Sequence, residues 1–167
     1  MVSEKTAAVA VVMGSDSDLA VMQCCIERLR EFGIEPVVRI ISAHRTPQVA
    51  AEFAERAARN GIKVIIAAAG MAAHLAGAVA GRTTLPVIGV PLTSASGLEG
   101  VDALLSTIQM PPGVPVATMA IGKAGAKNAA ILAVQILALS DESLAEKLAE
   151  FRKAQQEEVT EKDSALG

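Results

Sequence analysis

The chain has 167 residues, a length that suits one domain, and its formal net charge is −3 at pH 7. Hydrophobic residues make up 51% of the chain, yet aromatic residues make up only 2%. Proteins that bind single-stranded nucleic acid combine a positively charged groove with stacking aromatic side chains, so we expect no nucleic-acid partner. So apolar a composition in a short chain instead favours buried contacts between subunits.

A series of short aliphatic runs predicts strands, because near-continuous apolar runs are typical of strands that are covered on both faces. These runs span residues 7–13, 36–41, 63–69, 86–90 and 114–121. Helical patterns span residues 17–32, 47–60, 71–82, 98–108, 124–139 and 141–158. Strands that alternate with helices predict a parallel sheet with right-handed crossovers, and therefore a doubly wound α/β fold.

The pattern predicts a single domain over residues 1–167. We expect its core at about 8–140, a C-terminal helix at about 141–158 and a frayed tail at 159–167.

Neither a membrane span nor an export signal is expected. The apolar run IKVIIAAAGMAAHLAGAVAG contains Lys63, His74 and several glycines, and it divides better into a strand, a turn and a helix. The N-terminal segment has an early Glu in place of the basic start of a signal peptide. Cys24 and Cys25 are adjacent and belong to no metal-ligand pattern, so we expect reduced thiols, no metal and a cytoplasmic protein.

Small and polar residues follow every predicted strand. In doubly wound sheets, ligands bind at the carboxyl ends of the strands, near the switch in strand order. The segments that follow the strands in chain order are GSDSD, SAHRT, GMAAH, PLTSASG and GKAG. This repetition predicts a binding site at one edge of the sheet.

GSDSD (14–18) joins a strand to a helix, where free backbone amides favour an anion such as phosphate. For this motif alone, ordinary helix capping by Asp16 or Ser17 is the simpler interpretation. The motif is neither a P-loop nor a dinucleotide fingerprint. Asp18 is an unusual neighbour for an anion, and its natural partners are the hydroxyls of a sugar.

SAHRTP (42–47) is more specific. Arg45 can hold a phosphate through a two-pronged contact, and an imidazole such as that of His44 can act as an acid or a base near neutral pH. A solvated histidine beside a surface arginine is the alternative. The place of the pair at a strand end, opposite GSDSD, favours function.

AAAGMAAHLAG (67–77) surrounds His74 with Ala and Gly. This composition fits a small, poorly hydrated cavity, but helix–sheet packing around a satisfied histidine fits it equally well. SASGLEG (94–100) either covers the site or forms a turn before the next helix.

Taken together, these motifs resemble those of the bacterial N5-carboxyaminoimidazole ribonucleotide mutases, once called the catalytic subunit of phosphoribosylaminoimidazole carboxylase. The matching segments are VMGSDSD, SAHRTP, AAGMAAHLAG, IGVPL, STIQMPPGVPVATMAIG and AKNAAILAVQIL, from about Ala8 to Glu158. The resemblance implies a flavodoxin-like, three-layer α/β/α fold with strand order 2-1-3-4-5, in which the first three strand ends lie side by side.

The resemblance also implies a homo-octamer whose sites lie where subunits meet and whose C-terminal helix packs on neighbouring subunits. A transient contact with the ATP-dependent synthetase that supplies the substrate is a further expectation.

By the same resemblance, His44 is the catalytic residue. The implied substrate contacts are Ser15, Asp18 and Arg45, with supporting contacts at Ser42, Ala43, Gly70, Ala72, His74 and Leu75. The chain departs from the family at Met71, where a second Gly is usual, at Ala76, where Pro is usual, and at Leu19, where Trp is frequent.

The implied reaction moves a carboxylate from an exocyclic nitrogen of the ribonucleotide to the adjacent ring carbon, in purine (IMP) biosynthesis, without a cofactor. Our hypothesis is that His44 protonates the nitrogen, that CO2 is released and held beside GMAAH, and that His44 then takes the proton from the carboxylated carbon. One alternative is the related carboxylase that uses CO2 directly on aminoimidazole ribonucleotide. A more distant alternative is a non-catalytic flavodoxin-like module that binds a nucleotide.

Overall fold

The computed structural model describes residues 7–95 and 97–166, and it contains a parallel sheet in the order β2-β1-β3-β4-β5. The strands are β1 (Val9–Met13), β2 (Val37–Ile40), β3 (Val64–Gly70), β4 (Val87–Leu92) and β5 (Ala117–Thr118). The strand order 2-1-3-4-5 is therefore confirmed. It places β1 between β2 and β3, so the segments that follow these three strands meet at one edge.

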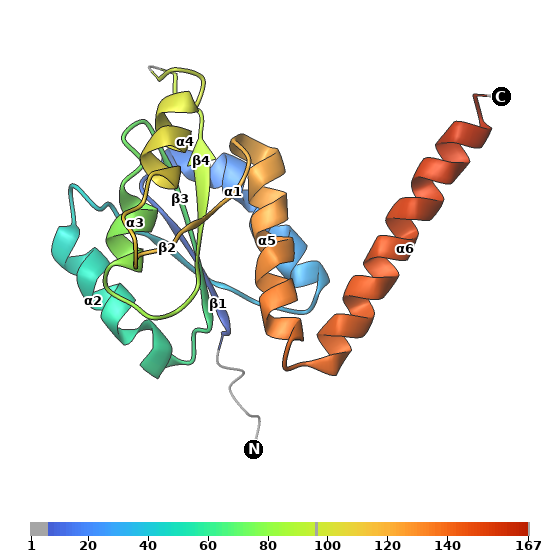
Figure 1. Cartoon of the computed structure of the whole chain (residues 1–167), viewed down its shortest axis with the longest axis horizontal. Coiled ribbons are helices and arrows are strands. Elements are labelled where there is room, and N and C mark those ends of the chain that lie inside the picture. The colour runs from blue at the N-terminus through green and yellow to red at the C-terminus, as the bar shows by residue number, and fades with distance from the viewer. Residues whose placement is uncertain (1–6, 96, 167) are drawn as a thin grey trace.

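Helices cover both faces of the sheet (Figure 1). They are α1 (Leu19–Glu31), α2 (Pro47–Ala57), α3 (Leu75–Ala80), α4 (Val101–Ile108), α5 (Gly122–Ala138) and α6 (Glu142–Ser164), with short 3-10 helices η1 (Asp16–Asp18) and η2 (Ala58–Asn60). Helices α1 and α5 lie on one face, and α2, α3 and α4 lie on the other. The result is the expected three-layer α/β/α arrangement.

Alternating residues of each central strand point to opposite faces of the sheet, as strand geometry requires. In β1, Val9 and Val11 pack with the buried residues of α1 and α5. Ala10 and Val12 pack with those of α2 and α3. Because helices cover both faces of the sheet, successive residues of the central strands are all apolar, as the sequence shows.

Strand β5 is shorter than the run predicted at 114–121 and keeps only Ala117 and Thr118. It pairs with β4 alone and forms the edge of the sheet. Pro115, two residues earlier, has no backbone N–H to donate to a neighbouring strand, which favours an edge position and a late start.

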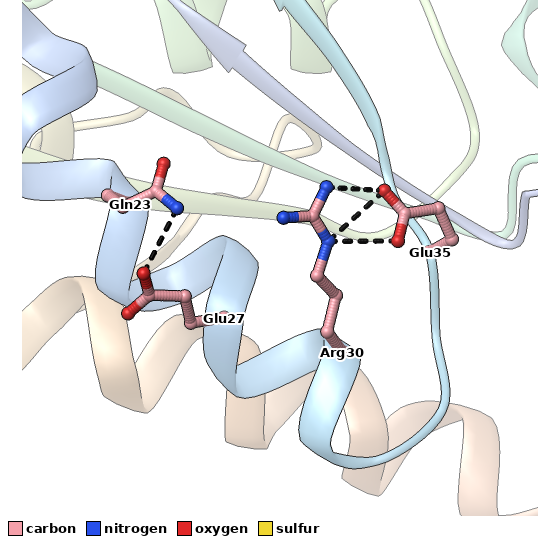
Figure 2. A network of polar contacts seen from close by, with 4 residues as sticks. All are labelled: Gln23, Glu27, Arg30 and Glu35. Atoms are coloured by element: carbon pink, nitrogen blue, oxygen red, sulfur yellow. Dashed lines mark hydrogen bonds and ion pairs between the residues drawn. The ribbon is translucent and has the colours of Figure 1, made fainter.

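Helix α1 is joined to β2 by a tight turn at Gly33, whose φ of +80° favours glycine. Figure 2 shows the ion pair across this turn: Arg30 Nη2 lies 2.6 Å from Glu35 Oε1, and Arg30 Nε lies 2.9 Å from Glu35 Oε2. Gln23 donates to Glu27 one turn away in the helix, also drawn in Figure 2. These pairs are exposed and contribute little to stability, but Arg30 and Glu35 tie the end of α1 to the strand that carries SAHRT.

The C-terminal helix differs from its prediction. Helix α6 continues to Ser164, so the tail expected to fray from residue 159 is helical there, while Gly167 lies outside the described residues. Pairs one turn apart support the extension, because side chains at i and i+4 are neighbours on a helix. Lys153 pairs with Glu157, and Lys162 pairs with Glu158.

The first half of α6 is anchored to α1. The ring of Phe151 packs edge-on against Phe32 at 5.6 Å, and Arg28 lies 5.0 Å above the same ring. The rest of α6 projects away from the body of the chain (red in Figure 1). Among the described residues, no helix combines the length and the apolar character that crossing a membrane requires.

Candidate active site

A cavity of about 530 Å³ opens at the carboxyl ends of β1, β2 and β3. Every site residue expected from the sequence lines it: Ser15, Asp18, Ser42, Ala43, His44, Arg45, Gly70, Ala72, His74 and Leu75. A second hollow, of about 320 Å³, lies near Gly33, Lys63 and Leu144 and contains none of them. The structure thus brings the whole expected set to one place.

The wall that follows β1 is built by a short 3-10 helix. Ser15 is its N-cap: its Oγ accepts from the Ser17 amide at 3.4 Å, and its own amide donates to Asp18 Oδ2 at 3.0 Å. The capping predicted for Asp16 or Ser17 is therefore made by Ser15, because the helix begins with Asp16 itself. Two amides that could meet an anion are occupied by this capping box in the ligand-free chain.

Asp18 is half-buried beside these amides. Burial raises the pKa of its carboxyl above the ordinary value of 3.8 because it disfavours the charged form. The hydrogen bond from the Ser15 amide, the nearby Gly14 amide and the charge of Arg45 act in the opposite direction and only partly offset burial. The exposed Asp16 behaves differently, since the Ser15 hydroxyl and nearby amides lower the pKa of its carboxyl.

Arg45 extends from the end of β2 to the turn after β1. Its Nη2 donates to the Gly14 carbonyl at 2.8 Å, and its Nε donates to Ser42 Oγ at 3.4 Å. Ser42 Oγ also accepts from the Arg45 amide at 3.1 Å. A guanidinium has five N–H donors, so these contacts fix its position and leave donors for an anion.

His44 and His74 meet across the cavity from the ends of β2 and β3. His44 Nε2 lies 2.9 Å from His74 Nδ1, and the rings are edge-to-face with centroids 4.9 Å apart. At this distance one nitrogen donates and the other accepts, so the two imidazoles share a hydrogen bond. Both side chains are exposed, while the neighbouring Leu75 and Ala76 pack between helix and sheet.

The segment between β3 and α3 determines how His74 reaches the cavity. A Cβ on Gly70 would meet the Leu92 carbonyl at 3.2 Å, so β3 approaches β4 very closely at this point. Met71 then adopts φ +55°, in the left-handed region. This reversal ends the strand and delays α3 to Leu75, so the helix predicted from residue 71 is wrong in its first turn.

The cavity also has lining residues that were not among the expected site residues: Gly14, Ser17, Ala69, Met71 and Ser94. Ser94 Oγ is buried, as is Asp102 Oδ1, and neither has a hydrogen-bond partner within the described residues. The sequence could have indicated Ser94 as a lining residue, because PLTSASG follows a strand at the same edge of the sheet.

Across residues 7–95 and 97–166, no three His, Cys, Asp or Glu side chains are grouped to hold a metal ion. Cys24 and Cys25 are free thiols. Burial raises the pKa of the Cys25 thiol to about 12, which makes it a poor nucleophile and a poor ligand.

Comparison with known proteins gives consistent matches. The family model described as AIR carboxylase matches residues 8–158. The N5-carboxyaminoimidazole ribonucleotide mutase of Escherichia coli K12 is 53% identical over 161 residues, which cover 96% of this chain and 95% of that protein. The protein of the same name from Haemophilus influenzae is 56% identical over 151 residues, covering 90% of this chain and 92% of its own.

A solved structure shares the fold. The crystal structure of Treponema denticola PurE superposes with a TM-score of 0.85 at 32% identity, covering 95% of this chain and 98% of that one.

Proposed function

Because this chain belongs to the AIR carboxylase family, we propose that it converts N5-carboxyaminoimidazole ribonucleotide to 4-carboxy-5-aminoimidazole ribonucleotide in purine biosynthesis. It is an intramolecular carboxyl transferase, as its relatives named as mutases indicate. The observation that carries the proposal is the pair of imidazoles, His44 and His74, in a cavity that Asp18 and Arg45 also line. A non-catalytic nucleotide-binding module does not need such a pair.

The ribose phosphate occupies the β1–β2 side of the cavity in this proposal. Arg45, held by Gly14 and Ser42, offers its remaining N–H groups to the phosphate. Asp18 accepts hydrogen bonds from ribose hydroxyls. Its partial burial beside Arg45 supports this role, because a carboxylate next to a phosphate needs hydroxyl donors rather than a second anion.

The base then lies over the His44–His74 pair. Protonated His44 gives its proton to the exocyclic nitrogen, and the bond from that nitrogen to the carboxylate carbon breaks to release CO2. The ring carbon of the aminoimidazole, an electron-rich enamine, attacks CO2 and forms the new bond between the two carbons. Neutral His44 takes the ring proton, which restores the aromatic ring and returns the histidine to its starting form.

His74 orients His44 through their 2.9 Å hydrogen bond, which favours one direction of the imidazole and supports its change of protonation. The small residues Ala43, Gly70 and Ala72 and the buried Leu75 shape the space beside the base. Holding CO2 there keeps it close to the carbon that attacks it, so recombination outcompetes escape.

We also propose a homo-octamer. Exposed apolar residues support buried contacts between subunits: Val101, Leu105 and Ile108 form a stripe along α4, and Val38 and Ile40 lie on the edge strand β2. In this proposal, the part of α6 that projects from the body (Figure 1) packs on neighbouring subunits. Both histidines are exposed in the single chain, which is consistent with a site completed where subunits meet.

A cytoplasmic location and a transient contact with the synthetase that supplies the carbamate complete the proposal. The free thiols of Cys24 and Cys25 are typical of a reducing compartment. Carbamates lose CO2 readily in water, which makes direct transfer from the preceding enzyme advantageous.

An initial-rate assay tests the function. With the carbamate substrate and no added bicarbonate, we expect carboxylated product to form. A requirement for bicarbonate and aminoimidazole ribonucleotide would identify the direct carboxylase instead, and no turnover with either substrate would leave only a binding module.

A further inference from the structure

Met71 carries a backbone conformation that its side chain disfavours. Its φ of +55° lies in the left-handed region, which glycine adopts freely and side chains with a Cβ adopt at a cost in free energy. Glu99, at φ +53°, is the other residue with this feature among the non-glycine residues that the structure describes. Such conformations persist where the surrounding structure enforces them and cluster at active sites, and Met71 lines the cavity whereas Glu99 does not.

Main-chain hydrogen bonds explain why the chain turns at residue 71, but they do not explain why that residue is a methionine. The Met71 carbonyl accepts from the Ala73 amide at 2.8 Å, and the Ala72 carbonyl accepts from the His74 amide at the same distance. These bonds fold the segment so that His74 reaches His44. A glycine at residue 71 would make the same bonds without strain, since they involve main-chain atoms only.

Packing does not explain the methionine either. The Met71 side chain is 51% exposed, so it fills no core position. It lines the cavity beside Gly70 and Ala72, which have little or no side chain, and it stands on the same strand end as His74. A large, flexible and exposed apolar side chain thus lines a cavity whose neighbouring walls are small.

We infer that Met71 covers the imidazole ring of the bound substrate, which closes the mouth of the cavity and limits the escape of CO2. This inference rests on the proposed function. Thioethers adapt to irregular surfaces and make favourable contacts with aromatic rings, and an aminoimidazole is such a ring. Met71 is therefore a positioning residue that determines how often released CO2 is recaptured.

The test compares Met71→Gly and Met71→Ala with Glu99→Gly. Met71→Gly removes both strain and thioether, Met71→Ala removes the thioether and keeps the strain, and Glu99→Gly removes strain outside the cavity. The readouts are the melting temperature without ligand and the ratio of carboxylated product to free aminoimidazole ribonucleotide formed from the carbamate.

We expect both glycine variants to melt at higher temperature than the unmodified chain. Both Met71 variants should lower the product ratio, by roughly two- to tenfold for a lost sulfur–aromatic contact, while Glu99→Gly keeps it. Met71→Leu restores the apolar bulk without the sulfur, so it should recover part of the ratio.

An unchanged product ratio in Met71→Gly and Met71→Ala would overturn the role of Met71 while leaving the mutase intact. An unmodified chain that forms no carboxylated product would overturn the proposed function itself, and with it this inference.

Discussion

At the scale of single residues, the site depends on two neighbours in sequence that reach in different directions. Arg45 turns to the Gly14 carbonyl after β1, and His44 meets His74 after β3. Because β2 lies next to β1 and β1 next to β3, one strand end carries both the phosphate anchor and the proton carrier that we propose. His44 and Arg45 are therefore adjacent in sequence because one extends toward β3 and the other toward β1.

Replacement of His44 by Asn should abolish most turnover while the protein still folds and binds ligand. Asn keeps some hydrogen bonding but cannot carry a proton, and a general acid–base group contributes on the order of 10²–10⁴-fold. His74→Asn should retain measurable activity, because Asn can still hydrogen-bond to His44. Steady-state kinetics of both variants checks this, and a His44 variant within about tenfold of wild type beside an inactive His74 variant would reverse the roles.

Arg45→Lys should weaken nucleotide binding, because an ammonium group keeps the charge but cannot make the planar, two-pronged contact. Isothermal titration with the product ribonucleotide measures the effect, and Arg39→Lys, an exposed arginine of β2 outside the cavity, is the matched control. Equal affinity in the two variants would remove Arg45 from the site.

Asp18→Asn should raise the melting temperature of the ligand-free chain at neutral pH. The folded-state pKa of Asp18 is raised, so the folded chain binds the proton more tightly than the unfolded chain does. The free energy of unfolding therefore falls as the pH rises from the unfolded-state pKa of Asp18 through its folded-state pKa. Above the folded-state pKa the whole loss of stability is present. Thermal melts should show the gain shrinking as the pH falls toward that pKa.

Asp16→Asn is the control, and it should lower the melting temperature at neutral pH. The folded-state pKa of Asp16 is lowered, so its charged form stabilises the fold at pH values above the unfolded-state pKa. A gain in Asp16→Asn, or a lower melting temperature in Asp18→Asn at neutral pH, would contradict this electrostatic interpretation.

At the scale of elements, the apolar pattern predicted the central strands, which are covered on both faces, and helices α1, α2 and α5, but it ended α6 too early. It failed where backbone geometry decides: Met71 delays α3, and an edge position shortens β5. The strand order came from the family resemblance rather than from the pattern. The contact between His44 and His74 joins residues thirty positions apart, and no local pattern encodes such a distance.

The packing of α4 on β4 gives an element-scale prediction. A Cβ on Gly89 would clash with Thr107 Cγ2 and lie 2.9 Å from Val116 Cγ1, so Gly89→Ala forces these side chains to shift. Overpacking of this kind costs about 1–3 kcal/mol. Gly81→Ala, where the nearest atom is 3.6 Å away and φ is −70°, should be nearly neutral. Denaturant unfolding compares them, and equal stabilities would refute the close packing.

At the scale of the whole molecule, the apolar composition and the exposed apolar residues of α4 and β2 predict that the chain forms an oligomer. Light scattering should report a mass near that of eight chains. Leu105→Glu in the exposed stripe of α4 should reduce the mass, since a buried unpaired carboxylate is costly, and lower activity with it. A stable monomer with full activity would contradict both the octamer and a site that is shared between subunits.

The fate of the carboxylate carbon tests the proposed function most directly. The carbamate substrate is labelled with ¹³C at that carbon and converted by the wild-type chain in an excess of unlabelled bicarbonate, and the product is analysed by mass spectrometry. A mutase that holds CO2 beside His44 and His74 should leave most of the label in the product. Product whose new carboxylate comes mainly from bicarbonate would show that the chain carboxylates free aminoimidazole ribonucleotide, and would contradict the mutase.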